Sequence, residues 1–366
     1  MKAPEAFLRR ILDALAWWIG RAGPSLAAND ALLVPICTRL LELTRGEEAS
    51  DSDDPVFRAI NHPVGHATEA VFHWWLQQGP GEGAGIRPDV AGFFGTLCDP
   101  TADIFVHGRV ILAGRLATLY WCDPGWTDSK LLPFFEWQGT QIVAVWTGFL
   151  FAPRLNRPLL ERIRRPFIET AHHIERLNDN SLHNYASVLT YVALEPEPAL
   201  SLDDLRPVVR GLPVKALDRV SLALSESLGA AGAGRADLFR AGVNRFMRDL
   251  WPQDRGEVRT ASTSEHFARC CVRAAKAFPE AVQQLSPWLA PVEHQYVVVS
   301  ELARTGLCSD FPRDSLAFLD QITDDRSLTP AEFEKCLDAI RTAAADLSED
   351  PRFVRLSTYF KQRGAM

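Results

Sequence analysis

The amino-acid sequence predicts an all-α protein, and three observations support this prediction. Apolar residues recur at the spacing of one helix face, helix-capping residues stand where these stretches begin, and no convincing run alternates apolar with polar residues as a half-buried strand would. The nearest exception is the β-branched run at residues 295–299, which continues into a helical pattern through Leu302.

The helical period is clearest in two long stretches. Residues 103–121 bring Ile104 and Ile111 onto one apolar stripe. Residues 155–178 repeat this spacing, but Pro166 should kink or split that helix because proline lacks the N–H that the next backbone hydrogen bond needs. Four further stretches follow the same period: 181–194, 204–210, 214–228 and 236–250.

The expected helix boundaries carry their own signals. Ser201 followed by Asp204 places a capping oxygen and a negative charge at a helix start, where free N–H groups and the helix dipole favour them. Residues 262–265 and 329–332 have the pattern of capping boxes, the second with proline at the first helical position. Gly79 can end the helix before it.

Three breaks divide the chain. Residues 46–55 form an acidic loop, residues 79–88 a loop rich in glycine and proline, and residues 195–204 a linker. We therefore expect two lobes, an aromatic-rich helical lobe at 1–196 and a second helical lobe at 197–366.

A weak repeat in the second lobe suggests stacked helix pairs. Glu265 and His266 begin a stretch that ends in Phe278 and Pro279, and a second Glu-His pair begins one that ends in Phe311 and Pro312, 33 residues after the first Phe-Pro pair. Helix pairs at this pitch are typical of HEAT and armadillo solenoids. The alternative is an irregular helical domain in which the two Phe-Pro pairs coincide by chance.

Composition excludes several classes of protein. The 366 residues carry a net charge of −7, which argues against a generally basic nucleic-acid surface. Seven cysteines include the neighbours Cys270 and Cys271 and no CxxC, as expected of buried thiols in a reducing cytoplasm. The longest uncharged stretch, residues 137–153, is shorter than the ~20 residues of a membrane span, so we expect no membrane association.

The best candidate site is a histidine cluster. His66, Glu69 and His73 share one face of an expected helix, and His62 precedes it. Imidazole and carboxylate groups can bind zinc or iron, so a metal-dependent enzyme with a site near His62, His66 and Glu69 is one hypothesis. The alternative is that these histidines cap helices or pack beside Trp74. Further candidate ligands are His172, His173, Glu175 and His183, which no spacing connects to the cluster.

Motifs of catalysis and cofactor binding are absent. The glycines of residues 79–85 follow a helix, and those of residues 229–234 lack the strand that precedes a phosphate-binding loop. No Gly-x-Ser-x-Gly or His-Glu-x-x-His occurs. We therefore predict a protein that is not an enzyme, with no catalytic, cofactor-binding or metal-ligating residues.

One dense basic segment offers a third hypothesis. It contains five arginines: Arg154, Arg157, Arg162, Arg164 and Arg165. Such a patch could hold nucleic-acid phosphates. Glu161 and Glu169 lie nearby for helix pairing, however, and aromatic interleaving is limited to Phe167, so we favour a solvated, salt-bridged helix face over nucleic acid.

Adjacent tryptophans point to lateral surfaces. In the pairs Trp17-Trp18 and Trp74-Trp75, both rings cannot face one core from the same helix. We expect one ring of each pair to meet a second helix layer or a partner protein.

Several phrases resemble a known family. Residues 59–70 (AINHPVGHATEA), Trp251 with Pro252, residues 278–282 and Gly306 with Leu307 are similar to segments of an uncharacterised helical C-terminal region. That region belongs to bacterial anti-phage defence proteins with an upstream sirtuin-like or P-loop NTPase domain. The resemblance spans about residues 55–360.

This resemblance implies a region that senses a partner or trigger, or an oligomerisation scaffold, and no sirtuin-like or NTPase motif occurs in this chain. We therefore expect a non-catalytic interaction subunit of a cytoplasmic defence complex. Its partner would be an effector subunit or a phage protein, and self-association is compatible with the same role.

Overall fold

The computed structural model describes residues 5–26, 31–45, 54–323 and 332–364, and it confirms the predicted all-α class. Every regular element in these ranges is a helix, and none of them contains a strand. The chain divides into two compact units, Met1–Tyr185 (unit 1) and Ala186–Met366 (unit 2). This division falls inside one helix, Asp179–Leu194, whereas the sequence placed the lobe boundary in the loop after it.

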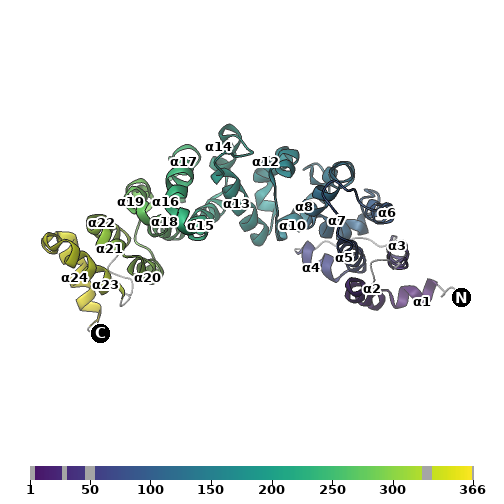
Figure 1. Ribbon diagram of the computed structural model, residues 1–366, viewed down its shortest axis with the longest axis horizontal. Helices are drawn as coiled ribbons and strands as arrows, with labels where there is room; N and C mark the ends of the chain where they lie inside the picture. The colour runs from purple at the N-terminus through teal and green to yellow at the C-terminus, as the bar shows by residue number, and fades with distance from the viewer. Residues whose placement is uncertain (1–4, 27–30, 46–53, 324–331, 365–366) are drawn as a thin grey trace. The chain divides into compact units, whose positions relative to one another are not determined.

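Unit 1 is built around a buried central helix, α5. The helices of this unit are α1 (Glu5–Arg10), α2 (Leu12–Ala22), α3 (Leu33–Thr44), α4 (Pro55–Asn61), α5 (Pro63–Leu76), α6 (Pro88–Leu97), α7 (Val106–Ala113), α8 (Leu116–Cys122), α9 (Pro124–Trp126), α10 (Ile142–Phe151), α11 (Arg157–Arg162), α12 (Arg164–Thr170) and the first part of α13 (Asp179–Leu194) (Figure 1). Helix α5 contacts α2, α3, α4 and α7, and α10 packs against both α7 and α4.

Two glycines permit these close contacts. A Cβ atom at Gly65 would lie 1.7 Å from the carbonyl oxygen of Ala59, because α4 and α5 meet at a tight corner. A Cβ atom at Gly148 would lie 2.4 Å from the carbonyl oxygen of Val110, where α10 crosses α7. No side chain larger than hydrogen fits at either crossing without a shift of backbone.

The expected break near Pro166 is present but lies earlier in the chain. Helix α11 ends at Arg162 and α12 begins at Arg164, with Ile163 between them at φ −96° and ψ 12°. Pro166 therefore sits in the first turn of α12, where its missing N–H leaves no hydrogen bond unmade.

Unit 2 arranges its helices in two rows. They are α14 (Leu202–Gly211), α15 (Val214–Ala230), α16 (Arg235–Leu238), α17 (Asn244–Asp249), α18 (Ala261–Arg273), α19 (Phe278–Leu285), α20 (Gln295–Thr305), α21 (Leu307–Asp310), α22 (Pro312–Ile322), α23 (Glu332–Ala343) and α24 (Pro351–Gly364). Helices α15, α18, α20 and α23 contact one another in that order, and α17, α19 and α22 lie along the other side (Figure 1).

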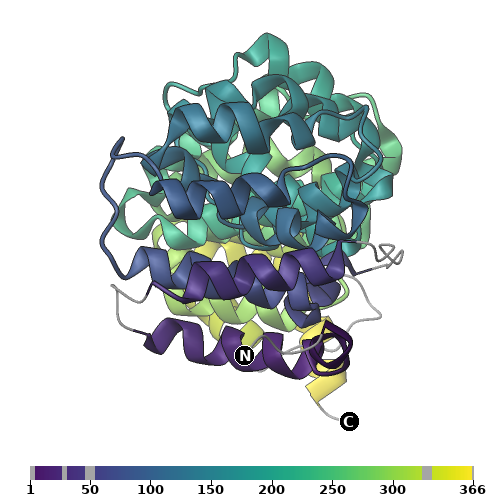
Figure 2. The ribbon, with the colours of Figure 1, turned by 90° about the vertical axis from the view of Figure 1, so that its right-hand side faces the viewer.

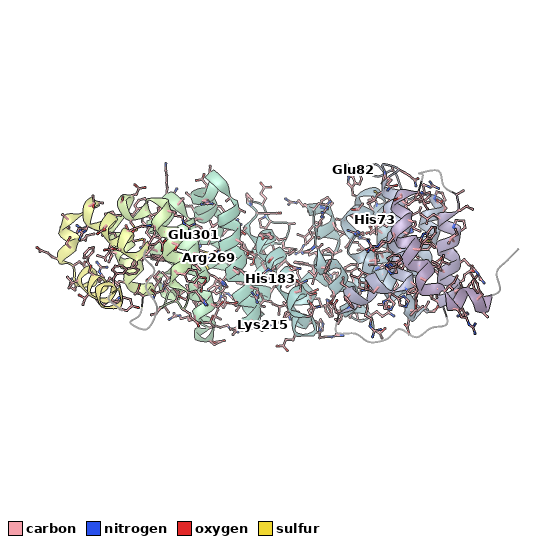
Figure 3. The ribbon with its side chains drawn as sticks, turned by 90° about the horizontal axis from the view of Figure 1, so that it is seen from below. His73, Glu82, His183, Lys215, Arg269 and Glu301 are labelled. Atoms are coloured by element: carbon pink, nitrogen blue, oxygen red, sulfur yellow. The ribbon has the colours of Figure 1, made fainter. Side chains whose placement is uncertain are left out.

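Polar side chains link three helices of the first row. Arg273 on α18 donates from Nε to Glu301 on α20 at 2.8 Å and from Nη1 to the carbonyl oxygen of Ser225 on α15 at 3.0 Å. Arg269, one turn earlier, lies 3.9 Å from the same carboxylate (Figure 3). Because these side chains are largely buried, their positions depend on one another.

The β-branched run at residues 295–299 begins α20. Val298 and Val299 are fully buried, and α20 packs against α18 and α23. Burial in a packed helix outweighs the small helix-propensity deficit of β-branched residues, so the sequence pattern there is a core face.

The two Phe-Pro pairs have equivalent positions. Phe278 begins α19 and Phe311 immediately precedes α22, each with proline in the first helical turn. Their rings lie 6.4 Å apart, with Phe278 buried and Phe311 partly exposed, so these parts of the two sequence copies pack against each other.

The predicted helix caps are confirmed in part. Ser201 and Asp204 form a complete capping box. The helix predicted to start at residues 262–265 is capped two residues earlier, where Thr260 accepts from the N–H of Thr263. Gly79 has φ +66° two residues beyond the C-cap of α5. The capping box predicted at residues 329–332 extends outside the described residues.

Candidate functional site

His62 stands at the corner between α4 and α5. Its Nδ1 accepts a hydrogen bond from the N–H of Val64 at 3.2 Å, so the imidazole is the N-cap of α5. Its ring stacks on His107 of α7 with 4.0 Å between ring centroids. Burial lowers the pKa of each imidazole to about 4, which keeps the stacked pair neutral at pH 7.

The other members of the predicted cluster line a groove. A groove of about 490 Å³ runs along α5, with its other walls formed by α2 and α4. From α5 it is lined by His66, Glu69 and His73, the last of which is labelled in Figure 3. The residues of α2 and α4 in this lining are Trp17, Gly20, Arg21, Ile60 and Asn61. The sequence prediction that His66, Glu69 and His73 share one helix face is confirmed.

Electrostatics favour uncharged histidines in this groove. Burial lowers the pKa of His66 and of His73, and the carboxylate of Glu69 offsets part of this effect for both. Arg21 lowers the pKa of His66 further, and its guanidinium also lies 5.6 Å from the ring centre of Trp17. The groove therefore combines an aromatic ring, a cation, a carboxylate and two neutral imidazoles.

The structure does not assemble a metal site from these side chains. Across the described ranges no group of three or more His, Cys, Asp or Glu residues has the geometry to hold a metal ion. His62 is turned to Val64 and His107 and is not part of the groove lining. Of the remaining candidate ligands, His173 stacks on Trp137 at 4.3 Å, and none lines the groove.

The two tryptophan pairs differ in solvent exposure. Trp74 and Trp75 on α5 are 1% and 2% exposed, because helices surround α5 on several sides. Trp17 and Trp18 on α2 are 54% and 58% exposed. The burial of both Trp74 and Trp75 agrees with the expectation of a second helix layer for one ring of that pair. Within the described chain no second layer covers Trp17 or Trp18, so a partner protein for one of these rings stays a prediction.

Large exposed apolar side chains gather near the N-terminus. Seven of the twelve found among the described residues belong to α1–α4 and the residue before α3: Phe7, Trp17, Trp18, Leu32, Ile36, Phe57 and Ile60. We call these seven the N-terminal apolar set. Figure 2 is a view toward the end of unit 1 that carries α1–α3.

The basic segment is largely neutralised by ion pairs. Arg157 bonds Glu161 at 3.1 Å within α11, and Arg162 bonds Asp128 at 2.8 Å. Arg165 bonds Glu136 at 2.5 Å. These contacts support the salt-bridged helix face and leave less positive charge for phosphates.

Unit 2 contains a Ser-His-Asp group that differs from a hydrolase triad. Nδ1 of His266 lies 2.9 Å from Oγ of Ser221 and 3.7 Å from Oδ1 of Asp218. A triad needs serine and aspartate on opposite ring nitrogens, so that the base can take the serine proton while the carboxylate orients it. Here both contact the same nitrogen, and the group links α15 to α18.

Sequence reasoning missed Arg109, a fully buried arginine on α7. Its guanidinium donates to the carbonyl oxygens of Leu97, Asp99 and Ala102 at 2.8–3.0 Å and also bonds Gln141. Burial lowers its pKa to about 10, and the group stays charged. The signal available was a cation flanked by apolar residues within the stretch at residues 103–121, which also contains Arg115.

No known protein family, curated protein or solved structure matches this chain. Among the described helices, none has the length and apolar character required to cross a membrane.

Proposed function

We propose that this chain is a non-catalytic protein-interaction scaffold or sensor subunit of a cytoplasmic, bacterial anti-phage defence complex. The partner is an effector subunit or a phage protein. The N-terminal apolar set, of which Trp17 and Ile60 line the α2–α5 groove, is the observation that carries this proposal, because exposed apolar side chains in number are typical of protein interfaces.

The groove suits recognition of a polypeptide. Trp17 and Ile60 offer apolar contact, while Arg21, Asn61 and Glu69 offer charge and hydrogen bonds at the same opening. Residues that dominate the binding energy of an interface are usually aromatic side chains that the partner buries and that polar groups surround.

The rows of unit 2 support the architectural part of the proposal. Successive helices of one row contact each other, and the equivalent Phe-Pro positions pack together, as in HEAT- or armadillo-like solenoids. Such stacks present long lateral surfaces, which fits a scaffold.

A capture experiment tests the proposal. The full chain with an affinity tag, the variant Trp17→Ser/Trp18→Ser and the control Tyr296→Ser are purified from phage-infected host bacteria, and bound proteins are quantified by mass spectrometry. Tyr296 is 59% exposed and lies on unit 2, so it matches the exposure of the tryptophans.

We expect one effector or phage protein at a fixed ratio with the wild type and the control. Loss of two anchor rings should reduce its recovery by at least about tenfold. Equal recovery with all three proteins, or no specific protein at all, would contradict the proposal.

A further inference from the structure

One face of α2 has the composition of a helix-pairing surface. Leu12, Ala16 and Ile19 are buried on the side that packs against α5. The exposed side carries Asp13, Ala14, Trp17, Trp18 and Arg21, and its edge reaches the α2–α5 groove that Trp17 and Arg21 help to line. Asp13, Trp17 and Arg21 follow each other at four-residue spacing, so they form one stripe along the helix with an anion at one end and a cation at the other.

The two charges of this stripe lack ionic partners in the described parts of the chain. Asp13 makes no ion pair with an arginine or lysine there, and its charge raises the pKa of the neighbouring His62 and His66. Arg21 contacts the ring of Trp17 and lowers the pKa of His66. Some other exposed arginines of unit 1 do form ion pairs, as with Arg9 and Glu5 at 3.0 Å or Arg87 and Asp89 at 2.6 Å. An anion and a cation that bracket an exposed tryptophan are suited to a partner with the opposite order of charges.

An antiparallel copy of the same helix has that order. If two α2 helices pack about a two-fold axis at Trp17, the residue four positions before Trp17 faces the residue four positions after it in the other copy. Asp13 of each copy then faces Arg21 of the other, and the two Trp17 rings meet at the axis. The surface is therefore complementary to itself, which a two-fold dimer requires.

We propose that a second copy of this chain covers the exposed face of α2 through this antiparallel pairing. The inference rests on the proposed role of this region in protein binding and adds self-association of the chain to it. Trp17 and Trp18 are each just over half exposed, so they contribute about 200–300 Å² per copy. This is less than the roughly 800 Å² a side of a standard stable interface, so the dimer should dissociate in the micromolar range.

Charge reversal tests the pairing directly. Wild type, Asp13→Arg, Arg21→Asp and the double variant are compared by sedimentation velocity between about 1 and 100 µM, with far-UV circular dichroism as a check on folding. Each single reversal places like charges together twice across the axis, and should weaken dimerisation by about tenfold or more. The double variant restores both pairs and should dimerise like the wild type.

Mixing gives the most specific readout. The Asp13→Arg variant carries two cations on the stripe and the Arg21→Asp variant carries two anions. Each variant alone should dimerise weakly, whereas an equimolar mixture should form a stable heterodimer. The control Tyr296→Ser should dimerise like the wild type.

A wild type that stays monomeric at 100 µM would overturn the inference, as would a double variant or mixture that fails to recover dimer. Either result concerns self-association alone, because the proposed function is judged by the separate capture of an effector or phage protein.

Discussion

Acid should destabilise this protein through the stacked pair of His62 and His107. In the unfolded chain each imidazole titrates near its ordinary pKa of 6.5, whereas in the fold each titrates near 4. Between these values the unfolded chain binds protons that the folded one does not. The free energy of unfolding must therefore fall as the pH drops from about 6.5 to 4, and level off for these groups below that.

The size of the effect follows from the two pKa values. Each pH unit between them corresponds to about 1.4 kcal/mol, so His107, which is 5% exposed, loses about 3 kcal/mol in total. Roughly 2 kcal/mol of this should be gone at pH 5. The pair as a whole loses less than twice these amounts, since each imidazole influences the titration of the other.

Urea unfolding followed by far-UV circular dichroism measures this loss. Wild type and His107→Phe are compared at pH 7 and pH 5, with His172→Phe as a control at an exposed histidine. His66, His73 and His266 also have lowered pKa values and contribute to all three proteins, so only the difference between variants counts.

The His107→Phe protein should lose about 2 kcal/mol less than wild type between the two pH values, and the control should lose the same as wild type. Identical pH dependence in wild type and His107→Phe would refute the reasoning.

Three further predictions concern stability, each measured by urea unfolding at pH 7. Arg109→Met should destabilise by about 3–5 kcal/mol, because it leaves several buried carbonyl oxygens without a donor; a loss below about 1 kcal/mol would contradict the role of this guanidinium as a clamp. Gly148→Ala should destabilise by about 1–3 kcal/mol, because its Cβ would collide with the carbonyl oxygen of Val110, whereas Gly95→Ala, which meets no atom within 4 Å, should be neutral or stabilising; equal effects would refute the close-approach argument. Ser201→Ala should destabilise by about 1 kcal/mol through loss of its capping bond, and an unchanged free energy of unfolding would show that the cap is dispensable.

Several features of the fold could be predicted from local sequence because their causes are local. The capping box at Ser201 depends on groups three residues apart, and the proline-marked starts of α19 and α22 depend on a single ring in the first turn. The shared face of His66, Glu69 and His73 follows from helical period alone.

Whether similar sequence features are buried or exposed is decided by the tertiary structure. Trp17-Trp18 and Trp74-Trp75 look alike in the sequence, yet one pair is exposed and the other is buried, because α5 is surrounded by other helices and α2 lies at the end of unit 1. His62 separates from His66 at the corner of α4 and α5. The helical period states which side chains share a face, but what covers that face depends on contacts between segments distant along the chain.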